Sequence, residues 1–162
     1  MAEHDFPVDR SAILVFAAAL GETNPIYWDE AYASATPLGA VIAPPTFAVA
    51  SAHWNPHHAL RGIRRIPAAP PGREARPSES AGDGASLLRV LHGEQRFVYH
   101  QPIRAGMQLR VSTRPGKSWE KQGKRGGKLR FSETISEYRD AGGELVVTAT
   151  SVGIVTEKAV EA

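Results

Sequence analysis

Apolar and polar positions divide the chain into a helical first third and a strand-rich second half. The residues from Ile13 to Leu20 make a broad apolar face at helical spacing, which predicts a helix that packs on other elements. Asp9 or Ser11 can accept hydrogen bonds from the N–H groups at the start of this helix. Residues 1–9 carry no helical pattern, so we expect an extended lead-in.

A polar, turn-prone stretch follows this helix and cannot continue it. Gly21 can adopt the left-handed conformation that ends helices, and Pro25 disfavours the helical conformation at Asn24. We therefore expect a short irregular segment that holds Glu22, Asn24 and Tyr27 in fixed positions. Polar side chains on a loop beside a rigid element are frequently functional, so this segment is the first candidate site.

The stretch 46–54 is almost wholly apolar, which is typical of a buried helix. Pro45 is a favourable first residue for it, and Asn55 followed by Pro56 ends it. We expect this segment to be the central helix of the fold. Residues 62–85 then bring prolines, glycines and arginines without periodicity, which predicts a long mobile loop.

The second half has the pattern of strands. Five runs alternate apolar and polar positions or are rich in Val and Thr, at residues 95–100, 108–113, 117–122, 128–138 and 144–155. Asp-Ala-Gly-Gly at 140–143 predicts a hairpin turn. Helices followed by antiparallel strands indicate an α+β domain in which one sheet wraps around a buried helix.

Length and composition agree with one domain that covers residues 1–162. The absence of cysteine excludes disulfides and thiolate metal sites and fits a cytoplasmic protein. The apolar run at 12–20 is too short to span a bilayer, and acidic residues rather than a basic cluster precede it, against a signal peptide. A formal net charge of +2 gives no support to nucleic-acid binding.

Three motifs occur in order along the chain: Gly-Glu-Thr-Asn-Pro-Ile-Tyr at 21–27, Val-Ile-Ala-Pro-Pro-Thr-Phe at 41–47 and Tyr-His-Gln-Pro-Ile-Arg-Ala-Gly at 99–106. Together with the order of the predicted elements, they resemble the MaoC-like (R)-specific enoyl-thioester hydratases and 3-hydroxyacyl-thioester dehydratases. The resemblance covers roughly residues 8–156. It is strongest to the subfamily similar to the N-terminal half of fatty-acid-synthase-like dehydratases. It implies a single hot-dog fold, an antiparallel sheet wrapped around a buried central helix.

The resemblance also implies a chemistry. Hydration of an enoyl thioester needs a base that activates water, an acid that protonates the α-carbon, and donors that polarise the thioester carbonyl. The resemblance implies that active family members carry an Asp and, five residues later, a His. At these two positions this chain has Glu22 and Tyr27. The longer Glu side chain displaces its carboxylate, and misplacement by about 1 Å can cost about 100-fold in rate. Tyrosine is a poor proton carrier near neutral pH, so both catalytic positions look degenerate.

The start of the expected central helix departs from the family pattern as well. At this point the local sequence of active members is similar to Ala-His-Gly and offers a backbone N–H to the substrate carbonyl. This chain has Ala43, Pro44 and Pro45 instead. Proline has no N–H, so this donor is missing. The resemblance implies substrate contacts at Asn24, Pro25, Pro45 and Thr46.

In heteromeric members of the family, one subunit resembles this chain, binds the acyl tail and pairs with a second subunit that carries the Asp and His. We therefore expect the substrate-binding, non-catalytic half of an (R)-specific enoyl-CoA hydratase or 3-hydroxyacyl-thioester dehydratase, in a heterodimer or heterotetramer. The alternatives are a self-sufficient homodimeric hydratase that uses Glu22 and an acyl-thioester binding protein without chemistry. The expected ligand is an acyl-CoA or acyl carrier protein thioester, with no cofactor, metal, nucleic acid or membrane.

Most candidate residues also have a structural interpretation. Glu22 fits an exposed residue near a helix end, Asn24 fits a turn cap, and Tyr27 fits a packing residue. Lys124 and Arg125 can hold the phosphates of coenzyme A, and they also fit an exposed hairpin tip.

Two histidines invite a metal interpretation, because His53 and His57 have the i, i+4 spacing of helical ligands. Pro56 breaks the helix between them, and no nearby carboxylate completes the set. We therefore expect no metal site at these residues. His100 is expected to be a structural residue of a strand.

Overall fold

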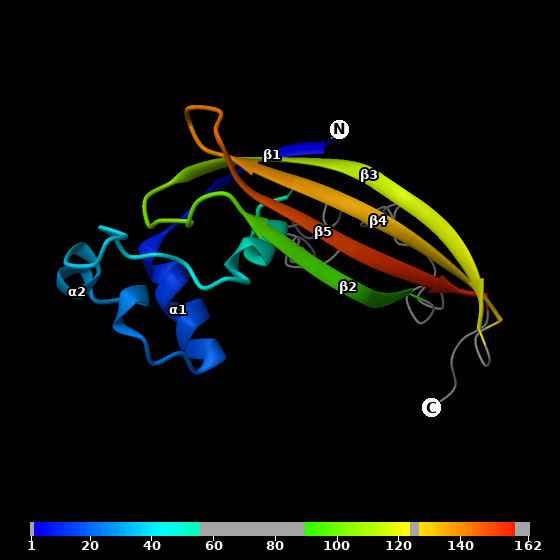
Figure 1. The fold of residues 1–162 in the computed structure, drawn as a ribbon, viewed down its shortest axis with the longest axis horizontal. Helices are drawn as coiled ribbons and strands as arrows, with labels where there is room; N and C mark the ends of the chain where they lie inside the picture. Colours follow the sequence, from blue (N-terminus) through cyan, green and yellow to red (C-terminus); the bar gives the residue numbers. More distant parts are fainter. Residues whose placement is uncertain (1, 56–89, 124–126, 158–162) are drawn as a thin grey trace, which may run out of the picture.

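The computed structural model describes residues 2–55, 90–123 and 127–157 (Figure 1). In these residues, five strands form one sheet of antiparallel neighbours in the order β1-β3-β4-β5-β2. The strands are β1 at Ala2–Pro7, β2 at Val90–Tyr99, β3 at Gln108–Gln122, β4 at Lys128–Arg139 and β5 at Leu145–Thr156. The helical elements are α1 at Arg10–Leu20, α2 at Glu30–Ser34, and the 3₁₀ segments η1 at Pro25–Tyr27 and η2 at Phe47–His53.

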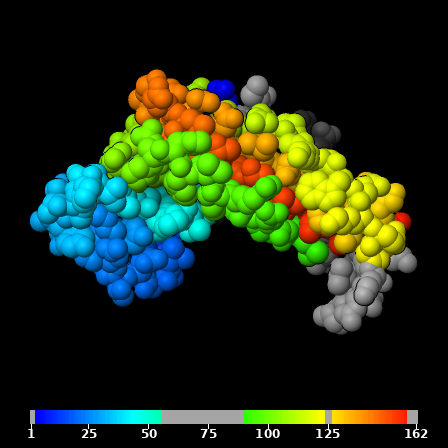
Figure 2. All heavy atoms as spheres, in the orientation of Figure 1, coloured from blue at the N-terminus to red at the C-terminus, as the bar shows by residue number. Residues whose placement is uncertain are grey.

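The sheet is a curved layer, and the helices lie together near one end of it (Figure 1). Figure 2 shows the bowed shape that results, with the helical part of the first third of the chain gathered on the concave side of the strands. An antiparallel sheet with few helices, arranged in this way, confirms the expected α+β hot-dog class. The predicted loop at 62–85 lies outside the described residues.

Helix α1 has the end signals that the sequence predicts. The side chain of Asp9 accepts hydrogen bonds from the backbone N–H groups of Ser11 and Ala12, at 2.8 and 3.3 Å. Gly21 follows the helix with a φ of 72° and donates its N–H to the carbonyl of Ala18 at 3.0 Å. The chain therefore leaves α1 in a defined direction and enters the candidate loop.

The expected central helix is present as η2, which is shorter than predicted and wound as a 3₁₀ helix. Thr46 precedes the segment and Phe47 is its first residue, so the helix does not begin at Pro45. Phe47 and Ser51 are buried, but Val49 is 45% exposed. The three alanines of η2 favour an α-helix, so low helix propensity does not explain its winding, although 3₁₀ winding is common in short segments. The segment thus differs from the expectation in its start, its winding and its burial.

Strand β3 is continuous where the sequence predicted two separate runs. Its register with β4 shifts between Pro115 and Ser118, and pairing resumes beyond the irregularity. Gly116 lies so close to β4 that a side-chain carbon there would be 2.7 Å from the Cβ atom of Glu133, so only glycine fits. Pairing with β4 therefore carries the strand across a Pro-Gly break in the sequence pattern. The extended lead-in at 1–9 is confirmed as the edge strand β1, which pairs with β3.

Aromatic rings fill the space between α1, η2 and the sheet. Phe47 of η2 stacks on Phe6 of β1 with ring centroids 5.6 Å apart. Phe16 of α1 meets the Phe47 ring edge-on at 5.4 Å. Such pairs add stability beyond their buried area, and here they join three elements that are distant in sequence.

Tyr138 of β4 fixes η2 by hydrogen bonds. Its side chain is buried, and its hydroxyl donates to the backbone carbonyl of Ala48 at 3.0 Å. The hydroxyl of Ser51 lies 2.9 Å from the same oxygen. Burial raises the pKa of the Tyr138 phenol, and the Ser51 hydrogen bond lowers it by less, so the phenol stays protonated. η2 is therefore held at one place on the sheet.

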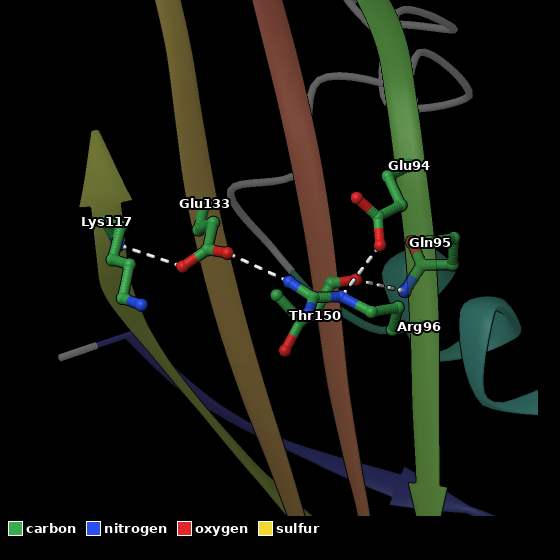
Figure 3. A network of polar contacts seen from close by, with 6 residues as sticks. All are labelled: Glu94, Gln95, Arg96, Lys117, Glu133 and Thr150. Carbon is green, nitrogen blue, oxygen red and sulfur yellow. Dashed lines mark hydrogen bonds and ion pairs between the residues drawn. The ribbon is translucent and has the colours of Figure 1, made fainter. Parts of the chain in front are cut away.

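Glu133 of β4 links three strands on the other face of the sheet (Figure 3). Its carboxylate accepts a hydrogen bond from the guanidinium of Arg96 on β2 at 2.9 Å, across the intervening strand β5. The backbone N–H of Lys117, in the irregular part of β3, donates to the second carboxylate oxygen at 3.0 Å. The Glu133 side chain is only 12% exposed, so these contacts are shielded from water.

We expect Tyr138→Phe to lower the free energy of unfolding by about 1–3 kcal/mol, because a buried carbonyl and hydroxyl lose this partner. Urea unfolding measures the loss. Tyr32→Phe is the matched control, since the Tyr32 side chain is 48% exposed, and it should change stability by less than about 0.5 kcal/mol. Equal effects of the two substitutions would contradict the assigned role of Tyr138.

We expect Glu133→Ala to destabilise the fold by about 1–3 kcal/mol, because it removes two hydrogen bonds from a shielded carboxylate. Glu120→Ala is the control, since Glu120 pairs with Lys128 between side chains that are 51% and 52% exposed. Exposed pairs contribute about 1 kcal/mol or less. Thermal unfolding of both variants tests the difference, and a Glu133→Ala protein as stable as the control would refute the link.

Candidate functional site

The three sequence motifs meet in space at one end of the molecule. Backbone hydrogen bonds join them: Ile42 N–H to the Ile26 carbonyl at 3.4 Å, Ala43 N–H to the Ile103 carbonyl at 2.8 Å, and Ala105 N–H to the Val41 carbonyl at 2.9 Å. A β-bridge between Ile42 and Arg104 lies among them. Backbone bonds do not depend on side-chain identity, so this frame is compatible with many different site residues.

Asn24 and Pro25 shape the first motif. The side-chain oxygen of Asn24 accepts the N–H of Ile26 at 3.0 Å and caps η1, as its structural interpretation predicts. Pro25 is the first residue of η1, where its missing N–H costs nothing. Ile26 is buried, which anchors the loop in the core. Contact of Asn24 or Pro25 with a substrate stays a prediction.

Glu22 and Tyr27 lie at the two ends of this loop. Glu22 is exposed, and its backbone N–H bonds to the carbonyl of Ala17 at 3.0 Å at the end of α1. Tyr27 is partly buried and packs against the hydrophobic core. Burial raises the pKa of the Tyr27 phenol, and the charge of Glu22 raises it further. The phenol is therefore neutral at physiological pH and can donate a hydrogen bond but cannot accept a proton.

Pro45 and Thr46 are exposed at the start of η2. The hydroxyl of Tyr99, from the end of β2, donates a hydrogen bond to the carbonyl of Pro45. Burial raises the pKa of Tyr99 to about 12, so the hydroxyl keeps its proton. Sequence reasoning included Tyr99 in the third motif but missed this contact, because the two residues are far apart along the chain.

A cavity of about 440 Å³ opens on the concave face of the sheet, beside the second half of η2. Sequence reasoning missed it entirely. Most of its hydroxyl groups come from strands and one comes from η2: Ser51, Thr113, Thr134, Ser136, Tyr138 and Ser151. The only sequence signal was the presence of Ser and Thr at alternate positions of strands whose inner faces were expected to be apolar.

Several predicted candidates cannot be placed. Lys124, Arg125 and His57 lie outside the described residues, whereas His53 is exposed at the last position of η2. Within residues 2–55, 90–123 and 127–157, no group of three His, Asp or Glu side chains could hold a metal ion. None of the helices in the same ranges is long and apolar enough to cross a bilayer.

His100 follows the last residue of β2 rather than lying within a strand. Its backbone N–H donates to the carbonyl of Val146 at 2.9 Å, and its ring nitrogen lies 3.3 Å from the hydroxyl of Thr148. Both contacts are with β5, so His100 extends the attachment of β2 to the sheet.

Comparison with known proteins places this geometry in a family. The family described as "FAS1-like, dehydratase domain region" matches residues 1–149. A UPF0336 protein of Parafrankia sp. (strain EAN1pec) is 31% identical over 145 residues, which are 90% of this chain and 81% of that protein. A UPF0336 protein of Streptomyces avermitilis is 33% identical over 108 residues, 67% of this chain. That match spans only 60% of the relative's length.

Solved structures share the fold at low sequence identity. The HadBC (3R)-hydroxyacyl-ACP dehydratase complex from Mycobacterium tuberculosis matches with a TM-score of 0.66 and 22% identity, over 94% of this chain and 93% of that one. The ChsH1-ChsH2 complex from the same organism also gives 0.66 and 22%, over 97% and 87%. The R-hydratase PhaJ1 from Pseudomonas aeruginosa gives 0.58 and 17%, over 97% and 79%. The family match and these folds agree with the three joined motifs: the chain belongs to the FAS1-like dehydratase region family and has the hot-dog fold of these hydratase and dehydratase structures.

Proposed function

We propose that this chain is the substrate-binding, non-catalytic subunit of a cytoplasmic (R)-specific enoyl-CoA hydratase or 3-hydroxyacyl-thioester dehydratase. One observation carries the proposal. The backbone frame of the three motifs is intact, but the position of the family imidazole holds the Tyr27 phenol, whose pKa is raised. The chain would bind an acyl-CoA or acyl carrier protein thioester, and a second MaoC-like hot-dog subunit would supply the Asp and His.

The electrostatics of the loop favour binding over catalysis. A general base works best when its pKa lies near the operating pH. The surroundings of Tyr27 move its pKa in the opposite direction, because burial and the charge of Glu22 both disfavour the phenolate. Pro44 and Pro45 also offer no N–H to a thioester carbonyl at the start of η2. Base and carbonyl donor would both have to come from another chain.

The edge strand β2 offers a place for that chain. β2 pairs with β5 on one side and ends the sheet in the described part of the chain. Its apolar side chains Val90, Leu91, Val98 and Tyr99 are 49%, 45%, 56% and 38% exposed. An edge strand with apolar side chains is a template for pairing with a further strand. A partner that adds its own edge strand here would cover these side chains and extend the sheet across a dimer.

Two of the similar structures support a heteromeric assembly, because HadBC and ChsH1-ChsH2 are described as complexes. The competing assignment is a homodimer that hydrates through Glu22. That residue is exposed, and the Tyr27 phenol beside it is a poor proton carrier, so this alternative is the weaker one. The two assignments predict opposite results for the isolated chain: no turnover for a non-catalytic subunit and turnover for a homodimeric hydratase.

The purified chain alone should not hydrate crotonyl-CoA or decenoyl-CoA. Addition of a MaoC-like hot-dog subunit that carries Asp-x-Asn-Pro-x-His should produce turnover, because that subunit supplies the acid and base. Loss of the enoyl absorbance follows the reaction, and release of free thiol is monitored as a control for hydrolysis. Turnover by the lone chain refutes the proposal. Thioester binding without product in any pairing would instead assign a binding protein without chemistry.

Glu22→Gln and Tyr27→Phe should leave kcat of the two-subunit enzyme within about threefold of wild type, since neither side chain transfers a proton in the proposal. Removal of a true general base or acid would lower kcat by about 100-fold or more. Both substitutions keep side-chain size, so circular dichroism should confirm unchanged folding. A loss of about 100-fold in the Glu22→Gln complex would assign Glu22 to the chemistry.

A further inference from the structure

The cavity beside η2 differs in character from the packed core next to it. Both lie on the concave face of the sheet, but the core is apolar, whereas the cavity lining combines apolar side chains with six hydroxyl groups. Ser51 lies four residues beyond Phe47, the first residue of η2. Val49, two residues beyond Phe47, also lines the cavity, so at a rise of about 2 Å per residue the cavity begins about 4 Å from the start of η2, where Pro45 and Thr46 are exposed.

The strand register explains why the apolar core gives way to a surface that carries hydroxyl groups. In one cross-strand row, Val111, Tyr138 and Val147 are opposite one another and buried. Side chains that point inward recur at every second residue of a strand. The next inward row therefore holds Thr113, Ser136 and Ala149. The row after it holds Pro115, Thr134 and Ser151. The inner face therefore changes from apolar to hydroxyl-bearing within two rows, at the point where η2 ends.

The hydrogen bonds within the cavity lining leave some donors and acceptors available to a ligand. Tyr138 gives its single proton to the carbonyl of Ala48, so Ser51 must be the donor in the 2.9 Å contact between the two hydroxyls. The Ser51 oxygen then retains acceptor lone pairs at the cavity. Thr113 and Ser136 lie 3.2 Å apart, and only one of their two protons can be used between them. The other proton is available to an acceptor in the cavity.

A plain alkyl chain can contact the apolar part of this lining but leaves its hydroxyl groups without partners. It would remove water from the hydroxyls of Ser51, Thr113 and Ser136 and return no hydrogen bond to any of them. A carbonyl or ether oxygen can accept a hydrogen bond from the Thr113–Ser136 pair, and a hydroxyl group can also donate one to Ser51. A cavity of about 440 Å³ is within the usual range for small-molecule sites, with room for such a group and part of the chain that bears it.

We propose that this cavity receives a polar, oxygen-bearing portion of the acyl group and makes Thr113, Ser136 and Ser51 specificity determinants for oxygenated over plain alkyl thioesters. The inference rests on the proposed function, because it takes the ligand to be an acyl thioester. It goes beyond that function by naming the chemical class of the acyl tail. The hydroxyl-bearing rows are the feature that separates this class from simple fatty acyl chains.

A matched pair of thioesters tests the inference on the full-length chain. Calorimetry should give an affinity for ω-hydroxydecanoyl-CoA about tenfold higher than for decanoyl-CoA. The double variant Thr113→Val, Ser136→Ala should lose this preference, since the substitutions nearly preserve shape and remove both hydroxyls. Ser112→Ala is the matched control on the outer face of β3 and should keep the preference.

The outcomes separate the two proposals. Binding of both thioesters with equal affinity, or tighter binding of decanoyl-CoA, overturns the inference and leaves the proposed function intact. The wild-type comparison alone decides this point, so it does not depend on correct folding of the double variant. A preference that persists in a folded double variant also overturns the assignment to these residues. Failure of both thioesters to bind, alone and with the catalytic subunit, overturns the proposed function itself.

Discussion

The hydrogen bonds of the Tyr138 hydroxyl determine how the concave face of the sheet is used. They hold η2 across the middle strands through Ala48 and Ser51. On one side of this contact, aromatic rings close the core against α1. On the other side, the strands continue beyond η2, and their hydroxyl-bearing rows line the cavity. One buried phenol thus separates the packed part of the molecule from the part that has room for a ligand.

The candidate loop lacks a suitable proton carrier, whereas the cavity has space and hydroxyl groups for a ligand. The loop keeps the backbone bonds that join the three motifs, but Tyr27 is an unsuitable proton carrier, because its pKa is raised. The cavity offers space for a ligand and hydroxyl groups that can form hydrogen bonds with it. These features support the proposed binding role, in which a partner subunit supplies the missing groups.

Local signals in the sequence predicted what local interactions decide. Asp9 and Gly21 flank α1, and Asn24 caps η1, because each acts on backbone groups only a few residues away. The continuity of β3 could not be predicted in the same way. Its Pro-Gly break is bridged by pairing with β4 and by the Glu133 contact to Lys117, which join residues from different parts of the chain. The 3₁₀ winding of η2 could not be predicted either, because its three alanines favour an α-helix and its position on the sheet depends on a hydrogen bond from the distant Tyr138.

The amino-acid sequence by itself determined the hot-dog class, the three motifs and the chemical identity of Glu22, Tyr27 and Pro45 at the candidate site. The motifs are short stretches of neighbouring residues that the chain carries when unfolded, and the hot-dog class is what their resemblance to a known family implies. The tertiary structure alone decided that Tyr99 reaches Pro45 and that hydroxyls from β3, β4, β5 and η2 share one cavity. Their proximity depends on strand register, because a shift of one residue would turn every one of the strand hydroxyls to the opposite face.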